Sequence, residues 1–347
     1  MSAPEENYLN RIAQYRGSPR EIGRAAGHRL GKKLEQNIRH YLNRRRAFID
    51  SDKLQREALP WLQSFPLRFQ EEFEGLAEGA GVPLQMLAEW NFVEECDLPQ
   101  CSGLICMHDG HAWVARNNDT YVPELWGYVT IREVTGRIAT ISFSMEGDVF
   151  TPTGINQERL WLHYNFLPVM DKPAQGKPHL PGYAFLVEAL ETCRTIEDVE
   201  KLLDEIDRDG GMLLFAVDGK SEEFALFECT CQDHYRRDPV DGWIVGTNHY
   251  CLIPDPDLAS EGPESSTLRR FQRLEDLNLS LERSKEPIQL PDDLIRILAD
   301  AGVERREKEL VTVYGNVACP SSKTIWYTFG GCPAASQGNW QQLAWPW

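Results

Sequence analysis

The sequence Leu98-Pro-Gln-Cys-Ser-Gly-Leu-Ile-Cys106, followed by Ala115-Arg-Asn-Asn-Asp119, decides the fold of this 347-residue chain. Here two short apolar runs are joined by Asp109-Gly110, and such a pair of turn residues between apolar runs predicts a β-hairpin. An internal cysteine opens the first strand, and an Arg-x-x-Asp segment ends the second. This layout is typical of a cysteine that becomes a new chain terminus, and it predicts a chain that cuts itself before it acts.

Upstream of this hairpin the pattern is helical. Apolar residues recur at steps of four over about residues 19–48, and further helical patterns cover about 53–77 and 84–95. Gly23, Gly27 and Gly31 follow one face of the first pattern. Because each glycine lowers helix propensity by roughly 1 kcal/mol relative to alanine, we expect another element to approach this backbone closely.

Downstream of Pro99, short apolar runs alternate with turn residues. Helical patterns at about 182–206, 265–284 and 291–303 separate the strands into blocks. Hairpins grouped in this way predict an α+β domain with antiparallel sheets covered by helices. The expected organisation is a helical N-terminal segment over residues 1–100 and a core over residues 101–347. The predicted strands cover residues 102–107, 111–117, 127–134, 137–144, 159–165, 212–217, 223–229, 242–248 and 323–329.

Charge and composition exclude several classes of partner. The formal net charge of −17 repels phosphate backbones and anionic lipids, so we expect neither nucleic acid nor a membrane as a partner. The first eight residues lack a basic start and an apolar stretch, which favours a cytosolic location. Nine cysteines are an odd number in a chain without a secretion signal, so a complete disulfide framework is not expected.

Cys101 is the candidate nucleophile. A free thiol has a pKa of about 8.5, so at neutral pH it needs a base, and the neighbouring sequence supplies no obvious one. An N-terminal cysteine carries its own base, because its α-amino group has a pKa of about 7.7–8.0. Breaking the Gln100-Cys101 peptide bond would create that terminus.

Several separated motifs together resemble a known family. The chain is similar to the cysteine N-terminal-nucleophile (Ntn) hydrolases of the acyl-coenzyme A:6-aminopenicillanate acyltransferase and carcinine hydrolase family. The motifs occur in the family's order over about residues 15–330: Gly17-Ser-Pro-Arg-Glu-Ile-Gly23, Cys101-Ser-Gly103, Ala115-Arg-Asn-Asn-Asp119, Gly154-Ile-Asn-Gln-Glu-Arg-Leu160 with Tyr164-Asn165, Gly246-Thr-Asn-His249, and Ser265-Ser-Thr-Leu-Arg-Arg-Phe-Gln-Arg273.

The resemblance implies a four-layer αββα fold and a role for each matching residue. Cys101 would be the nucleophile of self-cleavage and of acyl transfer, and Asp119 would orient its amine. Arg116 would lie beside the thiol, as in the related bile-salt and penicillin V hydrolases, where a cation favours thiolate. Asn248, and also Asn165, would donate N–H groups to the oxyanion of the tetrahedral intermediate.

The last motif leaves one choice open. An arginine after a serine pair braces the site in the family, and either Arg269 or Arg270 fits that position in this chain. The residue before the nucleophile is usually glycine in the relatives, and here it is Gln100. Glutamine resists the positive φ angles that glycine accepts.

The implied reaction is attack of the Cys101 thiolate on a linear amide or thioester and transfer of the acyl group to water or an amine. Hydrolysis is favoured, because water needs no acceptor pocket. The expected partners are a small N-acyl substrate, an acyl thioester as alternative donor, and the chain's own cleaved N-terminal fragment. A homo-oligomer stays open, and no cofactor is expected.

Three alternatives remain. An uncut cysteine hydrolase would activate Cys101 with His249 or His163. A metal site could use Cys229-Thr-Cys231-Gln-Asp-His234 or His108-Asp-Gly-His111, but neither has the paired spacing of a structural zinc site, so no metal is expected. A scaffold protein could also keep the Ntn fold without its activity.

Overall fold

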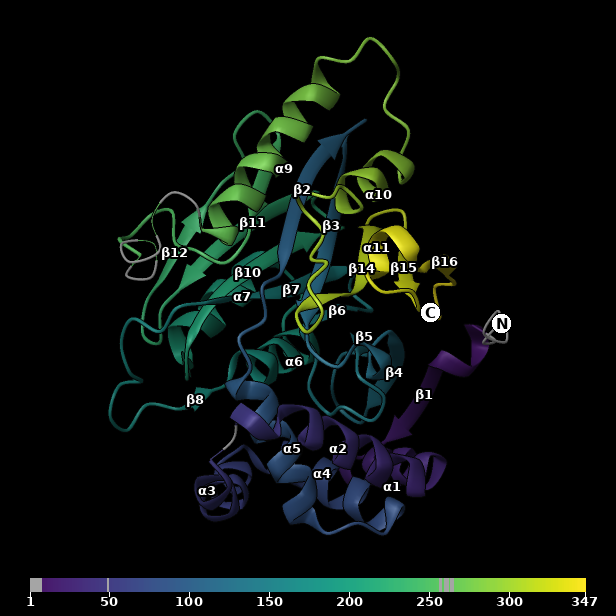
Figure 1. The fold of residues 1–347 in the computed structure, drawn as a ribbon, viewed down its shortest axis with the longest axis vertical. Coiled ribbons are helices and arrows are strands. Elements are labelled where there is room, and N and C mark those ends of the chain that lie inside the picture. The colour runs from purple at the N-terminus through teal and green to yellow at the C-terminus, as the bar shows by residue number, and fades with distance from the viewer. Residues whose placement is uncertain (1–7, 49, 256–257, 259–261, 263–264) are drawn as a thin grey trace. The chain divides into compact units, whose positions relative to one another are not determined.

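Helices dominate the first hundred residues, as the apolar periodicity predicts (Figure 1). The computed structural model describes residues 8–48, 50–255, 258, 262 and 265–347, so most of the N-terminal stretch used for the location lies outside the described residues. The chain forms two compact units, one of residues 1–98 and 127–151 and one of residues 99–126 and 152–347. The units describe packing, whereas the expected fragments 1–100 and 101–347 describe a backbone cut.

The first unit contains five α-helices among its described residues. The helix expected over 19–48 is two helices instead, because Gly31 has a φ of +52° and ends the first one. The helix expected over 53–77 is also two, since Pro66 has no N–H to continue a helix and the next one begins after it. The helices are α1 (Pro19–Leu30), α2 (Lys32–Arg45), α3 (Ser51–Gln63), α4 (Leu67–Ala80) and α5 (Leu84–Cys96). Short 3₁₀ turns cover Tyr8–Arg11 and Arg46–Phe48.

Glycines let α1 and α4 cross with their backbones in contact. A Cβ atom on Gly23 would lie 2.0 Å from the Glu72 carbonyl oxygen, and one on Gly27 would lie 2.5 Å from that of Leu76. Gly75 on α4 is equally enclosed by α1. The expected close approach is therefore confirmed for Gly23 and Gly27, whereas the third glycine of the pattern has open space around it.

A small sheet completes the first unit. β1 (Ile12–Gly17) was not predicted, and it pairs in parallel with β4 (Tyr128–Val134). β4 and β5 (Thr140–Ser144) form the hairpin predicted from Thr135-Gly136, and Gly136 has a φ of +80°. No described helix is long and apolar enough to cross a bilayer.

The second unit contains two antiparallel sheets. One has the order β13-β2-β3-β14-β15-β16, and the part of the other in this unit has the order β6-β7-β10-β11-β12. The strands of the first are β2 (Ser102–His108), β3 (His111–Thr120), β13 (Trp243–Gly246), β14 (Val311–Cys319), β15 (Thr324–Phe329) and β16 (Asn339–Leu343). Those of the second are β6 (Thr153–Asn156), β7 (Leu160–Leu167), β10 (Gly211–Asp218), β11 (Glu223–Cys229) and β12 (His234–Arg237). A minor pair, β8 (His179–Leu180) and β9 (Asp207–Arg208), and a 3₁₀ turn at Pro123–Leu125 complete the unit.

Helices cover the outer face of each sheet. α6 (Gly182–Thr192) and α7 (Ile196–Glu205) contact β6, β7, β10 and β11, whereas α9 (Ser266–Glu282), α10 (Asp292–Leu298) and α11 (Ala334–Gln337) contact the other sheet. The two sheets face each other, because a Cβ on Gly246 of β13 would lie 2.8 Å from Leu213 and Phe215 of β10. This is the predicted four-layer αββα arrangement (Figure 1).

Candidate active site

Cys101 lies directly before β2 and is fully buried. Its Sγ is 3.4 Å from Nη2 of Arg116 and 3.5 Å from Oδ1 of Asn118, and the same Nη2 donates to that oxygen at 2.6 Å. The two-residue turn at Asp109-Gly110 fixes the register in which β2 pairs with β3, and in this register Gly103 lies opposite Arg116. Arg116 is thus placed beside the thiol.

Burial dominates the electrostatics of this thiol. It raises the pKa of Cys101, the nearby Arg116 guanidinium lowers it, and the Asp119 carboxylate raises it again. The net effect is a raised pKa, so the thiol is neutral at pH 7 in the uncut chain. The cysteine needs a base before it can act as a nucleophile.

Asp119, at the end of β3, is fully buried with one satisfied oxygen. Its Oδ1 accepts a hydrogen bond of 2.6 Å from Thr312 Oγ1 on β14. Its Oδ2 has no hydrogen-bond partner among the described residues, and its nearest cation is Arg270 Nη1 at 4.0 Å. Burial raises the pKa of Asp119 to about 7, although Arg270 and Thr312 both act to lower it. In the uncut chain the Asp119 carboxyl group should therefore gain or lose its proton near neutral pH.

Asn248 and Arg270 hold the backbone on both sides of the Gln100-Cys101 bond. Arg270 Nη1 donates to the Cys101 carbonyl oxygen at 2.8 Å, and its Nη2 donates to Asn248 Oδ1 at 3.0 Å. Asn248 Nδ2 donates to the carbonyl oxygens of Phe166 at 2.9 Å and Pro99 at 3.3 Å. Burial lowers the pKa of Arg270 to about 10, which leaves it cationic at neutral pH.

The two candidate arginines differ in position. Arg270 is buried against the cysteine, whereas Arg269 is exposed. Ser265 caps α9 by accepting a hydrogen bond from the Leu268 N–H, so the helix that carries both arginines begins at Ser266.

Gln100 adopts no strained backbone. It is not among the described residues with positive φ, so glutamine meets no steric penalty at this position in the uncut chain. Its N–H donates to the Asp119 carbonyl oxygen at 2.9 Å.

Asn165 lies on β7 and has its donor already engaged. Its Nδ2 donates to the Thr247 carbonyl oxygen at 3.1 Å, while its Oδ1 has no partner among the described residues. In the uncut chain this side chain therefore supports the backbone that carries Asn248.

Three residues near the site were missed by sequence reasoning. Thr312 bonds Asp119, the Arg305 N–H donates to Thr312 Oγ1 at 3.0 Å, and Arg305 and Arg270 both donate to Ser266 Oγ. Ser266 belonged to a recognised motif without an assigned role. Arg305 lies in the loop before β14, and Thr312 lies on β14, which was not predicted. No local sequence pattern indicated either residue.

Several buried polar atoms close to Cys101 or on the neighbouring strands lack a hydrogen-bond partner among the described residues. In native proteins most buried polar atoms have partners, so these atoms could bind water or substrate. They belong to Gln100, Ser102, Arg116, Asn117, Asn118, Asp119, His163, Asn165 and Asn316, and a similar number of such atoms occurs elsewhere in the described residues.

Each histidine of the alternative mechanism has its Nδ1 atom bonded to a residue other than Cys101. His163 accepts a hydrogen bond of 3.0 Å from Trp161 Nε1, and burial holds its pKa well below the usual value. His249 lies 2.9 Å from Thr267 Oγ1, and burial lowers its pKa to about 4. In the described part of the chain no hydrogen bond joins either ring to Cys101.

The side chains of the metal alternative also have other partners. Cys231 Sγ donates to the Asp171 carbonyl oxygen at 3.2 Å, and His111 Nδ1 lies 2.8 Å from Glu222 Oε1. No cluster of three potential metal ligands occurs within the described ranges.

Several solved structures of hydrolases and acylases match part of this chain. A conjugated bile acid hydrolase from Clostridium perfringens is 15% identical with a TM-score of 0.48, covering 71% of this chain and 97% of the hydrolase. Penicillin V acylase from Agrobacterium tumefaciens is 15% identical with a TM-score of 0.49, covering 70% and 86%. The Caenorhabditis elegans ortholog of N-acylethanolamine-hydrolyzing acid amidase is 12% identical with a TM-score of 0.46, covering 64% and 93%. Likeness at this level carries no argument about function, and no curated protein matches the sequence.

A family model supplies the stronger finding. The model described as acyl-coenzyme A:6-aminopenicillanic acid acyl-transferase matches residues 106–332. The match contains Arg116, Asp119, Asn248 and Arg270 and begins five residues after Cys101. Because this range is about two thirds of the chain, the protein belongs to the acyl-coenzyme A:6-aminopenicillanic acid acyl-transferase family, a family of cysteine Ntn enzymes that hydrolyse amides or transfer acyl groups.

Proposed function

We propose that the chain cleaves itself between Gln100 and Cys101 and then acts as an N-terminal cysteine amide hydrolase. The observation that carries the proposal is the buried Oδ2 of Asp119, which accepts no hydrogen bond among the described residues and belongs to a carboxylate that influences the Cys101 thiol. A buried acceptor without a donor is costly, and a new α-amino group at residue 101 would supply that donor.

Self-cleavage requires that the thiol reach the preceding carbonyl carbon. The flanking carbonyl groups of Pro99 and Cys101 are held by Asn248 and Arg270, and such positioning favours an intramolecular attack. A bond forms between Sγ and the Gln100 carbonyl carbon, the C–N bond breaks, and the thiol proton moves to the released amine. Water then hydrolyses the thioester, which leaves a carboxylate on Gln100 and a thiol on Cys101.

The cut changes the base available to the cysteine. The free α-amino group has a pKa of about 7.7–8.0 and can accept the thiol proton during attack on a substrate amide. The acyl group passes to sulfur, the amine returns its proton to the leaving nitrogen, and water releases the acid. A local shift of Pro99 after the cut would free one contact of Asn248 Nδ2, and this supports its role as a donor to the oxyanion.

The substrate class proposed is a small molecule with a linear N-acyl amide bond, and hydrolysis is proposed over acyl transfer. A neutral thiol and an internal base need no cofactor. The fragment of residues 1–100 stays with the fragment of residues 101–347 as two associated chains.

Intact-mass spectrometry of the purified protein tests the cut. We expect two species that correspond to residues 1–100 and 101–347. Cys101→Ala should remain one full-length chain, whereas Cys106→Ala, a buried cysteine on the same strand, should still be cleaved. Cleavage of Cys101→Ala, or an active chain that stays uncut, would overturn the proposal.

The same measurement tests the chemistry. Incubation with linear N-acyl amides should add the acyl mass to the fragment of residues 101–347 and release the amine. If an added amine captures the acyl group faster than water does, acyl transfer replaces hydrolysis as the assigned reaction. If cleaved protein forms no adduct with a broad panel of amides, the scaffold alternative is favoured.

A further inference from the structure

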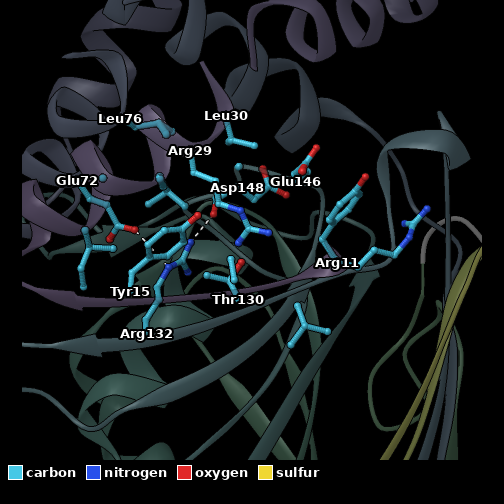
Figure 2. Close-up of a pocket in the computed structure, with 18 residues that line it drawn as sticks. Arg11, Tyr15, Arg29, Leu30, Glu72, Leu76, Thr130, Arg132, Glu146 and Asp148 are labelled. Carbon is cyan, nitrogen blue, oxygen red and sulfur yellow. Dashed lines mark hydrogen bonds and ion pairs between the residues drawn. The ribbon is translucent and has the colours of Figure 1, made fainter. Parts of the chain in front are cut away.

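Two groups of buried charged side chains differ in what they contact. In the first unit, Arg132 and Glu72 form an ion pair of 3.3 Å beside a cavity (Figure 2), and none of the residues assigned to the reaction lines that cavity. In the second unit, Arg305 belongs to a hydrogen-bond network that reaches both Cys101 and Asp119. The reaction proposed above assigns no step to Arg305, so its position in this network needs an explanation.

The side chain of Arg305 contacts the start of α9. Its Nη1 donates to the hydroxyl oxygen of Ser266, and Nε of Arg270 donates to the same oxygen at 3.3 Å. One hydroxyl oxygen can accept two such bonds, because it has two lone pairs. Arg270 is also the residue whose Nη1 donates to the Cys101 carbonyl oxygen at 2.8 Å. Ser266 therefore connects Arg305 to the guanidinium group that holds the backbone at Cys101.

The backbone of Arg305 contacts β14. Its N–H donates to Thr312 Oγ1 at 3.0 Å, and the Thr312 N–H donates to the Arg305 carbonyl oxygen at 3.1 Å. Since a backbone N–H can only donate, the Thr312 hydroxyl accepts this bond and gives its own proton to the bond with Asp119 Oδ1 at 2.6 Å. These bonds involve only the backbone of Arg305, so replacing its side chain tests the contact with α9 separately.

The charge of Arg305 acts on Asp119 and Arg270. Burial raises the pKa of Asp119 to about 7. The positive charge of Arg305 acts to lower this pKa, and the charges of Arg270 and Arg116 act in the same direction. Burial lowers the pKa of Arg270 to about 10, and Arg305 again contributes to the lowering. Glu307 Oε2 lies 2.9 Å from Arg305 Nε, but Glu307 is exposed, so water screens its charge.

We propose that Arg305 is a positioning residue for the cysteine reaction. Through Ser266 it holds Arg270 against the Cys101 carbonyl oxygen, and through its charge it favours the ionised form of Asp119. An ionised Asp119 accepts a hydrogen bond from the α-amino group that the cut creates at residue 101, and thereby orients the base. Among the described residues no hydrogen bond joins Arg305 to Cys101 itself. This role rests on the proposed function, because both groups on which Arg305 acts belong to that reaction.

The pH profile of the processed protein tests the effect of the charge. Arg305→Gln removes the charge, whereas Arg305→Lys keeps it. In p-nitroaniline release from N-acyl p-nitroanilides, the acid limb of Arg305→Gln should lie about 0.5–1 pH unit above that of the wild type, because Asp119 then needs a higher pH to ionise. Arg305→Lys should keep the wild-type limb. The position of the limb does not depend on how much of the protein is folded, so a loss of active protein cannot imitate this shift.

The rate of self-cleavage tests the contact with α9. In timed intact-mass measurements at a pH above the acid limb, Arg305→Gln and Ser266→Ala should each slow the cut by about two- to tenfold, which corresponds to the loss of about one hydrogen bond. The double variant should be no slower than the slower single variant, because both changes break the same connection. The control Arg306→Gln changes the exposed neighbouring residue and should cleave at the wild-type rate.

The outcomes separate this role from the proposed function. An upward shift of the limb in Arg305→Gln but not in Arg305→Lys, together with equal cleavage of the double variant and Ser266→Ala, supports the role of Arg305. A wild-type limb in Arg305→Gln, an equal shift in Arg305→Lys, or multiplied effects in the double variant overturns it. So does slower cleavage in Arg306→Gln than in Arg305→Gln.

In each of these outcomes the wild-type chain still cuts itself and forms the acyl adduct, so the proposed function stands. A wild-type chain that does neither refutes the proposed function and, with it, the role of Arg305.

Discussion

The hydrogen bond from Thr312 favours the ionised form of Asp119 and lowers its pKa, and Thr312→Val tests its effect on the proposed reaction. The replacement keeps the shape of the side chain but removes the hydroxyl that donates to Asp119 Oδ1 at 2.6 Å. The other oxygen of Asp119 has no partner among the described residues, so in the uncut chain the carboxylate loses its only side-chain hydrogen bond there. The replacement should therefore raise the pKa of Asp119 and increase the protonated fraction.

The size of the effect follows from the hydrogen bond. A hydrogen bond to a charged group contributes about 1.5–3 kcal/mol, and 1.36 kcal/mol corresponds to one pKa unit, so the pKa of Asp119 should rise by about 1–2 units. It begins at about 7. In the uncut chain at pH 7, the ionised fraction should fall from about one half to between roughly a tenth and a hundredth.

The same shift affects stability. The folded-state pKa of Asp119 is raised above the ordinary 3.8 by burial. Its contribution is therefore fully present below the ordinary pKa and is lost as the pH rises through about 7. In Thr312→Val this loss should extend about 1–2 pH units further, because the folded-state pKa is higher.

The assay is the pH dependence of p-nitroaniline release from N-acyl p-nitroanilides by the processed protein. We expect the acid limb of Thr312→Val to lie about 1–2 pH units above that of the wild type, so that the rate falls at low pH and recovers at higher pH. Thr312→Ser keeps the hydroxyl and should restore the wild-type profile. Thr153→Val removes a buried hydroxyl that bonds Tyr314 and should leave the limb in place.

An unchanged acid limb in Thr312→Val would refute the reasoning, because ionisation of Asp119 would then not govern the rate. A uniform loss of rate at every pH would refute it as well. Failure of Thr312→Ser to restore the profile would point to packing rather than to the hydroxyl.

Three further predictions rest on other contacts. Gly23→Ala should lower the free energy of unfolding in urea by about 1–3 kcal/mol, because its Cβ would lie 2.0 Å from a backbone oxygen. In the control Gly210→Ala the Cβ would meet nothing nearer than 3.7 Å, so the free energy should change by less than about 0.5 kcal/mol, and equal effects of the two variants would contradict the packing of α1 on α4. Arg270→Lys should slow self-cleavage by about tenfold or more in timed intact-mass measurements, since lysine cannot keep both hydrogen bonds of Arg270. The control Arg269→Lys changes an exposed residue and should cleave at the wild-type rate; slower cleavage in Arg269→Lys than in Arg270→Lys would contradict the assignment of Arg270 to the site. His163→Gln should keep the shape of the pH profile of activity between about pH 5 and 8, because burial keeps His163 neutral across that range. Loss of the acid limb in this variant would favour the cysteine-histidine alternative.

Much of the fold could be predicted from the sequence because its signals are local. The apolar period of α1 and α2 and the Asp109-Gly110 turn depend on neighbours only a few residues apart, and both predictions are confirmed in type and approximate position. The errors also have local causes. Gly31 ends a helix within a continuous apolar pattern. The strand β14 was not predicted because it contains Gly315 and Asn316, which are residue types typical of turns.

The candidate site could be predicted only in part. The sequence patterns alone predicted antiparallel sheets covered by helices and the proximity of Cys101 to Arg116 and Asp119, because a tight turn brings the two strands of that hairpin together. Only the tertiary structure decided that Arg270 rather than Arg269 reaches Cys101, since adjacent residues on a helix point about 100° apart and packing selects the inward one. It also decided that Thr312 donates to Asp119 Oδ1, because pairing between β3 and β14 depends on contacts between residues far apart in the chain.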